Sequence, residues 1–142
     1  MSLYEAVIFD MDGTLIDSEP IYRVADQLFL RDRGIELPEE VWDSFVGVGS
    51  VNMIERVKSE YGLTGETGEL LAEKDRYFRR AAAGRSKVFP ATRGLLEELV
   101  ARSIPCAIAT GSSLPTLRFS LEATDLEEYF HSTVSADEVE RG

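Results

Sequence analysis

The sequence is poor in the residue types that support disulfide, thiol or histidine chemistry. Its 142 residues include one cysteine, Cys106, and one histidine, His131. An intrachain disulfide is therefore excluded. Cys106 lies in the apolar run Ile-Pro-Cys-Ala-Ile-Ala, where a lone cysteine is typically a core residue. His131 follows Tyr129 and Phe130, and we expect it to be a packing or surface residue rather than a base.

Long apolar runs and an excess of basic residues are also missing. No run approaches the roughly 18 apolar residues of a membrane span, and no basic-then-apolar export signal opens the chain. With 26 acidic against 15 basic residues, the net charge of −11 would repel a nucleic acid backbone. We therefore expect no membrane, no nucleic acid partner and a cytoplasmic location, while the oligomeric state stays open.

The apolar pattern alternates between strand and helix. Ala6 to Phe9 is predicted to be a short buried strand that stops at Asp10-Met11-Asp12-Gly13. Residues 20–83 contain helical periodicity alone, with a break at Gly47-Val48-Gly49. After these come a helix at about 90–102, a strand at 104–109, a helix at 117–123 and a third short strand at 133–135.

This order predicts an α/β fold, with a parallel sheet interrupted after its first strand by a helical insert. Residues 1–17 and 86–142 would form the α/β core, and residues 18–85 the insert. The polar turns at Asp10 and Thr110 both follow the carboxyl ends of strands, which is the edge where open parallel sheets bind ligands.

The first turn carries two carboxylates that can have different tasks. Gly13 allows a sharp bend, so Asp10 and Asp12 can project into one cleft. One could stay ionised and attack a phosphoryl group, while the other transfers a proton. Like charges about 4 Å apart at an effective dielectric of about 20 repel by about 4 kcal/mol, so a hard cation such as Mg²⁺ is needed beside a phosphate.

The second turn, Thr110-Gly111-Ser112, offers hydroxyl and backbone N–H groups at the start of a helix, which suits an anion. Each turn also has a simpler interpretation: Asp-x-Asp-Gly as a solvated turn or calcium loop, and Thr-Gly-Ser-Ser as helix capping. The calcium loop fails, because Leu15 and Ile21 stand where it needs glycine and glutamate. The two turns together favour a phosphate site.

These motifs resemble those of a known family. The first turn is similar to the first signature motif of the haloacid dehalogenase-like hydrolase superfamily, through the run Val-Ile-Phe-Asp-Met-Asp-Gly-Thr-Leu-Ile-Asp-Ser-Glu. The second turn is similar to the second motif of that superfamily, through the run Ile-Ala-Thr-Gly-Ser-Ser. The helical insert resembles the cap of the β-phosphoglucomutase-like and phosphoglycolate phosphatase-like branch. The resemblance implies a Rossmann-like core, of which this chain holds the N-terminal strands, with an inserted helical cap.

The resemblance also implies roles for individual residues. Asp10 would be the nucleophile that takes the phosphoryl group and a Mg²⁺ ligand, and Asp12 the general acid/base that binds the metal through its carbonyl. Thr110, with Gly111 and Ser112, would bind the phosphoryl group. An aspartate at position 12 favours phosphoryl over carbon–halogen chemistry. The function implied is Mg²⁺-dependent release of phosphate from a small phosphorylated metabolite of the sugar-phosphate class, through an aspartyl-phosphate.

Two further motifs of the family, a lysine in a Gly-Lys-Pro-like stretch and a later acidic pair, are not in this sequence. We expect the 142-residue chain alone to be inactive. Gly47 to Ser50 resembles a cap loop that contacts substrate, although it could be a plain helix break. The arginine that β-phosphoglucomutases carry here is replaced by Ser50 or Val51. A phosphomutase, or a non-catalytic fragment that binds phosphate or a partner, remain the alternatives.

Overall fold

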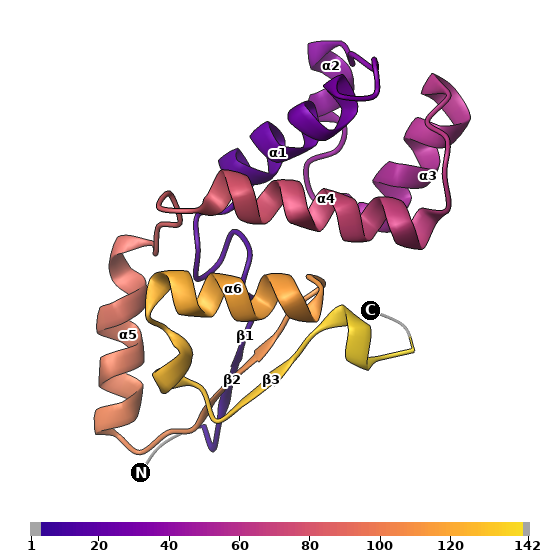
Figure 1. Ribbon diagram of the computed structural model, residues 1–142. Coiled ribbons are helices and arrows are strands. Elements are labelled where there is room, and N and C mark those ends of the chain that lie inside the picture. Colours follow the sequence, from indigo (N-terminus) through magenta and orange to yellow (C-terminus); the bar gives the residue numbers. More distant parts are fainter. Residues whose placement is uncertain (1–3, 141–142) are drawn as a thin grey trace. The chain divides into compact units, whose positions relative to one another are not determined.

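The computed structural model describes residues 4–140 and confirms the α/β class (Figure 1). Short 3₁₀ turns, η1 and η2, flank the last strand. In chain order the elements are β1 (Val7–Phe9), α1 (Glu19–Arg31), α2 (Glu39–Asp43), α3 (Ser50–Tyr61), α4 (Thr67–Ala82), α5 (Pro90–Ala101), β2 (Cys106–Ala109), α6 (Leu114–Thr124), η1 (Glu127–Tyr129), β3 (Ser132–Val134) and η2 (Ala136–Glu138).

The three strands form a parallel sheet in the order β1-β2-β3. Ile8 is paired with Ala107, and Ala109 with Val134. The second strand begins at Cys106 rather than at the predicted Ile104, since Pro105 has no N–H to donate to a ladder. The third begins and ends one residue earlier than predicted, because Ser135 starts the η2 turn through a capping box with Glu138.

Helices α5 and α6 pack on one face of this sheet. Cys106 and Ile108 of β2 are buried there against Leu96 of α5 and Leu117 of α6. Burial raises the pKa of the Cys106 thiol, which agrees with the predicted core role. The opposite face of the sheet carries Ile8, a residue that is 71% exposed. Sequence alternation therefore places apolar side chains on both faces, as expected for a parallel sheet.

The chain divides into two compact units, residues 4–20 with 82–140, and residues 21–81. The second unit is entirely helical and has its own core of eight buried residues: Phe29, Leu30, Trp42, Met53, Ile54, Val57, Leu63 and Leu70. The Trp42 ring contacts the ring of the partly buried Phe45 edge to face, at a ring-centroid distance of 6.3 Å. The connection between α2 and α3 contains Gly47, at a φ of +74° that favours glycine.

Candidate active site

The loop after β1 is folded around the main chain of Met11. Met11 is fully buried, and its main-chain carbonyl accepts hydrogen bonds from the N–H groups of Leu15 at 3.0 Å and Ile16 at 3.1 Å. Gly13 has a φ of +71° and donates its N–H to the Ile16 carbonyl at 2.9 Å. With Met11 anchored in the core, the acids on either side of it lie at or near the surface.

Asp10 is the exposed acid of this loop. Its Oδ1 accepts the Met11 N–H at 2.8 Å, while its Oδ2 lies 3.5 Å from the Thr14 hydroxyl. One carboxylate oxygen is thus held by the backbone, and the other is held more weakly. Such a carboxylate has a fixed position and an accessible oxygen, as a nucleophile requires.

Asp12 is partly buried and both of its carboxylate oxygens accept hydrogen bonds. The Ser18 hydroxyl donates to Oδ1 at 2.7 Å, and the Ser112 hydroxyl donates to Oδ2 at 2.5 Å. The second bond joins residues 100 positions apart in the sequence. The structure thus brings the Asp12 and Ser112 turns together at the carboxyl edge of the sheet.

The turn after β2 continues the sheet by one hydrogen bond, from the Thr110 N–H to the Val134 carbonyl at 3.0 Å. The Thr110 hydroxyl oxygen accepts the Ser112 N–H at 3.1 Å. Ser113 caps α6, with its hydroxyl oxygen accepting the Thr116 N–H at 3.4 Å. Thr110 is therefore held at both its main chain and its side chain.

Two residues of this region were not identified from the sequence. Ser18 is 1% exposed and contacts Asp12, but a serine six residues after an aspartate carries no distinctive signal. Asp137 accepts the Leu114 N–H at the start of α6 at 2.7 Å. No local sequence pattern indicates that Asp137 caps a helix that begins 23 residues earlier. The α6 N-terminus is therefore partly occupied by a protein carboxylate.

Comparison with known proteins identifies the family. The sequence profile of haloacid dehalogenase-like hydrolases matches residues 4–142. The chain belongs to the haloacid dehalogenase-like hydrolase family. This confirms the resemblance carried by the motifs at Asp10 and Thr110.

Several members of the family are similar over nearly all of this chain. It is 28% identical over 140 residues to a phosphoglycolate phosphatase of Yersinia pestis, covering 94% of this chain and 59% of the relative. It is 32% identical over 142 residues to a phosphorylated carbohydrates phosphatase of Thermotoga maritima, covering 97% and 64%. This haloacid dehalogenase-like chain thus spans about three fifths of the length of these relatives.

Solved structures of the family share the fold. CbbY from Rhodobacter sphaeroides, in complex with phosphate, superposes with a TM-score of 0.83 at 23% identity, covering 98% of this chain and 66% of that one. A candidate β-phosphoglucomutase from Thermotoga maritima superposes with a TM-score of 0.75 at 28% identity, covering 98% and 64%. These comparisons support the phosphoglycolate phosphatase-like and β-phosphoglucomutase-like branch of the haloacid dehalogenase-like family.

Haloacid dehalogenase-like phosphatases are generally metal-dependent, and the first loop suits a hard cation. The carboxylate of Asp10 and the main-chain carbonyl of Asp12 are oxygen donors of the kind that Mg²⁺ prefers. Within residues 4–140, no group of three or more histidine, cysteine or acidic side chains is arranged to hold a metal. This donor set fits Mg²⁺, which commonly binds one or two carboxylates and completes its shell with water and phosphate oxygens.

The segments that leave and re-enter the sheet unit are hydrogen bonded to each other. Ile16 and Val88 form an antiparallel bridge, and the Asp17 N–H donates to the Lys87 carbonyl at 2.8 Å. The end of the loop that carries Asp10 and Asp12 is therefore hydrogen bonded to residues 87–88, where the chain returns from the helical unit.

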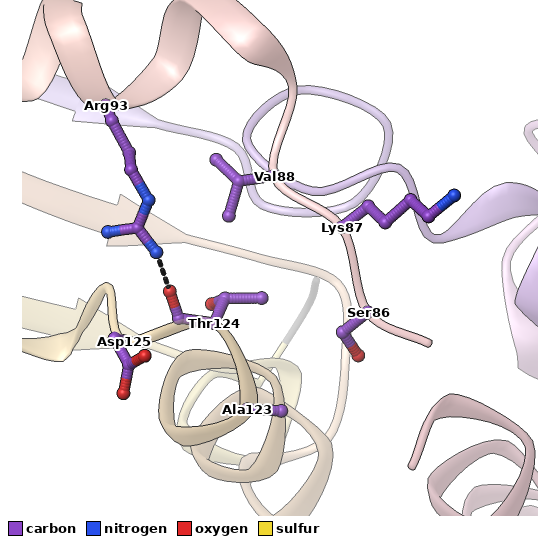
Figure 2. Close-up of a pocket in the computed structure, with 7 residues that line it drawn as sticks. All are labelled: Ser86, Lys87, Val88, Arg93, Ala123, Thr124 and Asp125. Carbon is purple, nitrogen blue, oxygen red and sulfur yellow. Dashed lines mark hydrogen bonds between the residues drawn. The ribbon is translucent and has the colours of Figure 1, made fainter. Parts of the chain in front are cut away.

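A hollow of about 380 Å³ lies beside this returning segment (Figure 2). Arg93 donates to the Thr124 carbonyl at the end of α6, and Lys87 points away from Arg93. Arg93 thus satisfies a terminal carbonyl of the helix, a structural role. The residues that line the hollow are Ser86, Lys87, Val88, Arg93, Ala123, Thr124 and Asp125, none of which the sequence predicted to be functional.

The two predicted cap residues lie in the helical unit. Gly47 is in the exposed connection between α2 and α3, and Ser50 begins α3. The Lys74 ammonium lies 3.2 Å from the Ser50 hydroxyl. Val46 is exposed in the same connection and Val51 is exposed in the first turn of α3, so this region presents apolar as well as polar groups. Among residues 4–140, no helix has the length and apolar content to cross a membrane.

Proposed function

We propose that this chain is the nucleophile-bearing part of a metal-dependent phosphatase that acts on a small phosphorylated metabolite. The observation that carries the proposal is the hydrogen bond between Asp12 and Ser112, which joins the two turns named by the family motifs. Two carboxylates and a set of hydroxyl and N–H donors thereby share one edge of a parallel sheet, the usual ligand site of such sheets.

Asp10 acts as the nucleophile. A carboxylate oxygen of Asp10 attacks phosphorus, and the bond from phosphorus to the leaving oxygen breaks. Asp12, protonated at this stage, gives its proton to the leaving oxygen. Asp12 then takes a proton from a water molecule that attacks the aspartyl-phosphate, so that inorganic phosphate leaves and Asp10 is restored.

The phosphoryl group is bound by the second turn. The Thr110 hydroxyl accepts the Ser112 N–H and so keeps its own proton for a phosphate oxygen. The Gly111 N–H follows directly and is the second donor that we assign. Mg²⁺ bound at Asp10 and the Asp12 carbonyl would neutralise phosphate charge, whose repulsion by a carboxylate at about 4 Å amounts to about 4 kcal/mol at an effective dielectric of about 20.

The substrate class is proposed from the relatives and from the helical unit. One relative is a phosphoglycolate phosphatase and another a phosphorylated carbohydrates phosphatase, so small phosphorylated acids and sugars are the class to test. The family resemblance assigns substrate choice to the cap, which we identify with the helical unit, residues 21–81. Gly47 and Ser50 are the cap residues that we propose to take part.

The experiment measures phosphate release by the complete gene product from 2-phosphoglycolate and a panel of sugar phosphates. Asp10→Asn removes the nucleophile and is expected to abolish release. Asp17→Asn is the matched control, since Asp17 belongs to the same loop and its main-chain N–H, which the substitution keeps, donates to the Lys87 carbonyl. Release that survives Asp10→Asn would refute the mechanism. Interconversion of sugar phosphate isomers with little free phosphate would favour the phosphomutase. Binding of a phosphate analogue without turnover would favour the non-catalytic alternative.

A further inference from the structure

Ser112 connects three segments of the sheet unit. Its N–H donates to the Thr110 hydroxyl oxygen at 3.1 Å, its hydroxyl lies 2.5 Å from Asp12 Oδ2, and its carbonyl accepts the Ala136 N–H at 3.1 Å. The side chain is partly buried. Ser112 is therefore engaged through its main chain and its side chain at once.

The hydrogen bonds to Asp12 fix the direction of its carboxyl group. Ser18 holds one oxygen at 2.7 Å and Ser112 holds the other at 2.5 Å, so the group cannot rotate without breaking one contact. Each carboxyl oxygen has two lone-pair sites, of which a serine hydroxyl occupies one. Both serine hydroxyls can therefore go on donating when Asp12 is protonated, and the acid proton stays available for the leaving oxygen.

We propose that Ser112 is a positioning residue for Asp12, rather than the phosphate ligand that its place in the Thr-Gly-Ser-Ser motif suggests. This inference rests on the proposed function of Asp12. The Ser112 N–H and hydroxyl already bond to protein groups, so a direct contact with phosphate would break the bonds that order Thr110 and Asp12. Ser112 thus couples the phosphate-binding turn to the acid/base.

The test uses two substrates that differ in their need for a proton. The nitrophenolate released from p-nitrophenyl phosphate leaves without protonation, whereas the alkoxide released from 2-phosphoglycolate needs the general acid. The value of kcat/KM reports the transfer to Asp10 and not the later hydrolysis. In Ser112→Ala we expect kcat/KM for 2-phosphoglycolate to fall about tenfold or more, which is part of the usual effect of a general acid. We expect kcat/KM for p-nitrophenyl phosphate to fall by less than about threefold.

Two variants control for a merely structural effect. Ser113→Ala removes the neighbouring hydroxyl, which caps α6, and should change both substrates by the same small factor. Ser112→Thr retains a hydroxyl and should keep the wild-type ratio between the substrates. An equal loss on both substrates in Ser112→Ala, as expected for a lost phosphate ligand, would overturn the proposal. So would the absence of any loss, or a threonine variant that behaves like alanine.

A second measurement does not depend on turnover. Crystal structures of the wild type and Ser112→Ala should show the Asp12 carboxyl group in one orientation in the former and in a changed or multiple orientation in the latter. If the wild type hydrolyses neither substrate, the proposed function fails, and these structures still decide the role of Ser112. An unchanged Asp12 in Ser112→Ala would refute positioning, whatever the activity.

Discussion

The ammonium of Lys74 lies 2.9 Å from the Asp26 carboxylate inside the helical unit, and the two residues are 3% and 9% exposed. The pair links α4 to α1. Lys74 also lies 3.2 Å from the Ser50 hydroxyl and 5.0 Å from the ring centroid of Tyr22. A lysine is rarely buried unless it is paired, and here the partner is supplied by another helix.

Removal of one member of this pair should strongly destabilise the helical unit. Lys74→Met leaves the Asp26 carboxylate buried without its cation, and we expect a loss of about 3–5 kcal/mol in the free energy of unfolding. Urea denaturation followed by tryptophan fluorescence measures it, because Trp42 lies in the same core. Lys58→Met is the control, because Lys58 is partly exposed, lies 3.8 Å from Glu55 and donates to the Thr67 hydroxyl; it should cost about 1 kcal/mol or less.

The double variant Lys74→Met with Asp26→Leu separates the cost of a lone charge from that of the pair. Replacement of both charges by apolar groups is often close to neutral, so the double variant should recover much of the stability lost in Lys74→Met. A double variant as unstable as the single one would show that the side chains matter for packing rather than for charge.

The exposed face of the sheet should promote association of the 142-residue chain. Ile8, in the edge strand β1, is 71% exposed on the face opposite α5 and α6. Ile8→Thr keeps a β-branched side chain and should change the free energy of unfolding by about 0.5 kcal/mol or less, while it reduces light scattering at high protein concentration. Val100→Thr, at an exposed position of helix α5, is the matched control and should leave the scattering unchanged.

The end of the described chain should respond to acid. The Glu138 carboxylate accepts hydrogen bonds from the Ser135 N–H at 2.9 Å and hydroxyl at 2.8 Å, which lower the pKa of Glu138 below its ordinary 4.5. Because the folded pKa is the lower one, the capping box stabilises the fold above pH 4.5 and is lost as the pH falls through the lowered pKa.

Carboxyl-detected NMR titration tests this shift directly. Ser135→Ala removes the hydroxyl donor but keeps the backbone donor, so the pKa of Glu138 should rise part of the way toward 4.5. Ser132→Ala in β3 is the control and should leave it unchanged. A Glu138 pKa at its ordinary value in the wild type would contradict the capping box.

Chelation should remove the phosphatase activity proposed for the complete gene product. EDTA is expected to abolish phosphate release, and Mg²⁺ to restore it, since Asp10 and phosphate repel each other without a cation. Ca²⁺ should restore less, because it prefers more ligands at longer distances than Mg²⁺. Full activity in the presence of the chelator would contradict the role of the metal.

The sequence determined the order of the elements and the two polar turns, because these depend on local properties. The alternation of apolar residues in short runs defines strands, and periodicity near 3.6 defines helices, so the interrupted α/β order could be predicted. Motif residues Asp10 and Thr110 were recognisable because the family motifs are contiguous in the chain.

Tertiary structure alone decided which side chains meet across the chain. Nothing local relates Ser112 to Asp12, Asp137 to the start of α6, or Lys74 to Asp26, since each pair lies on segments that only the packed sheet or helical unit brings together. Burial decided the contact of Lys74 with Asp26, because a polar group removed from water must find a partner wherever the fold supplies one. The exposed Asp137 bonds to Leu114 because the fold places its turn beside the first residues of α6. The residue types came from the sequence, and the partners from the fold.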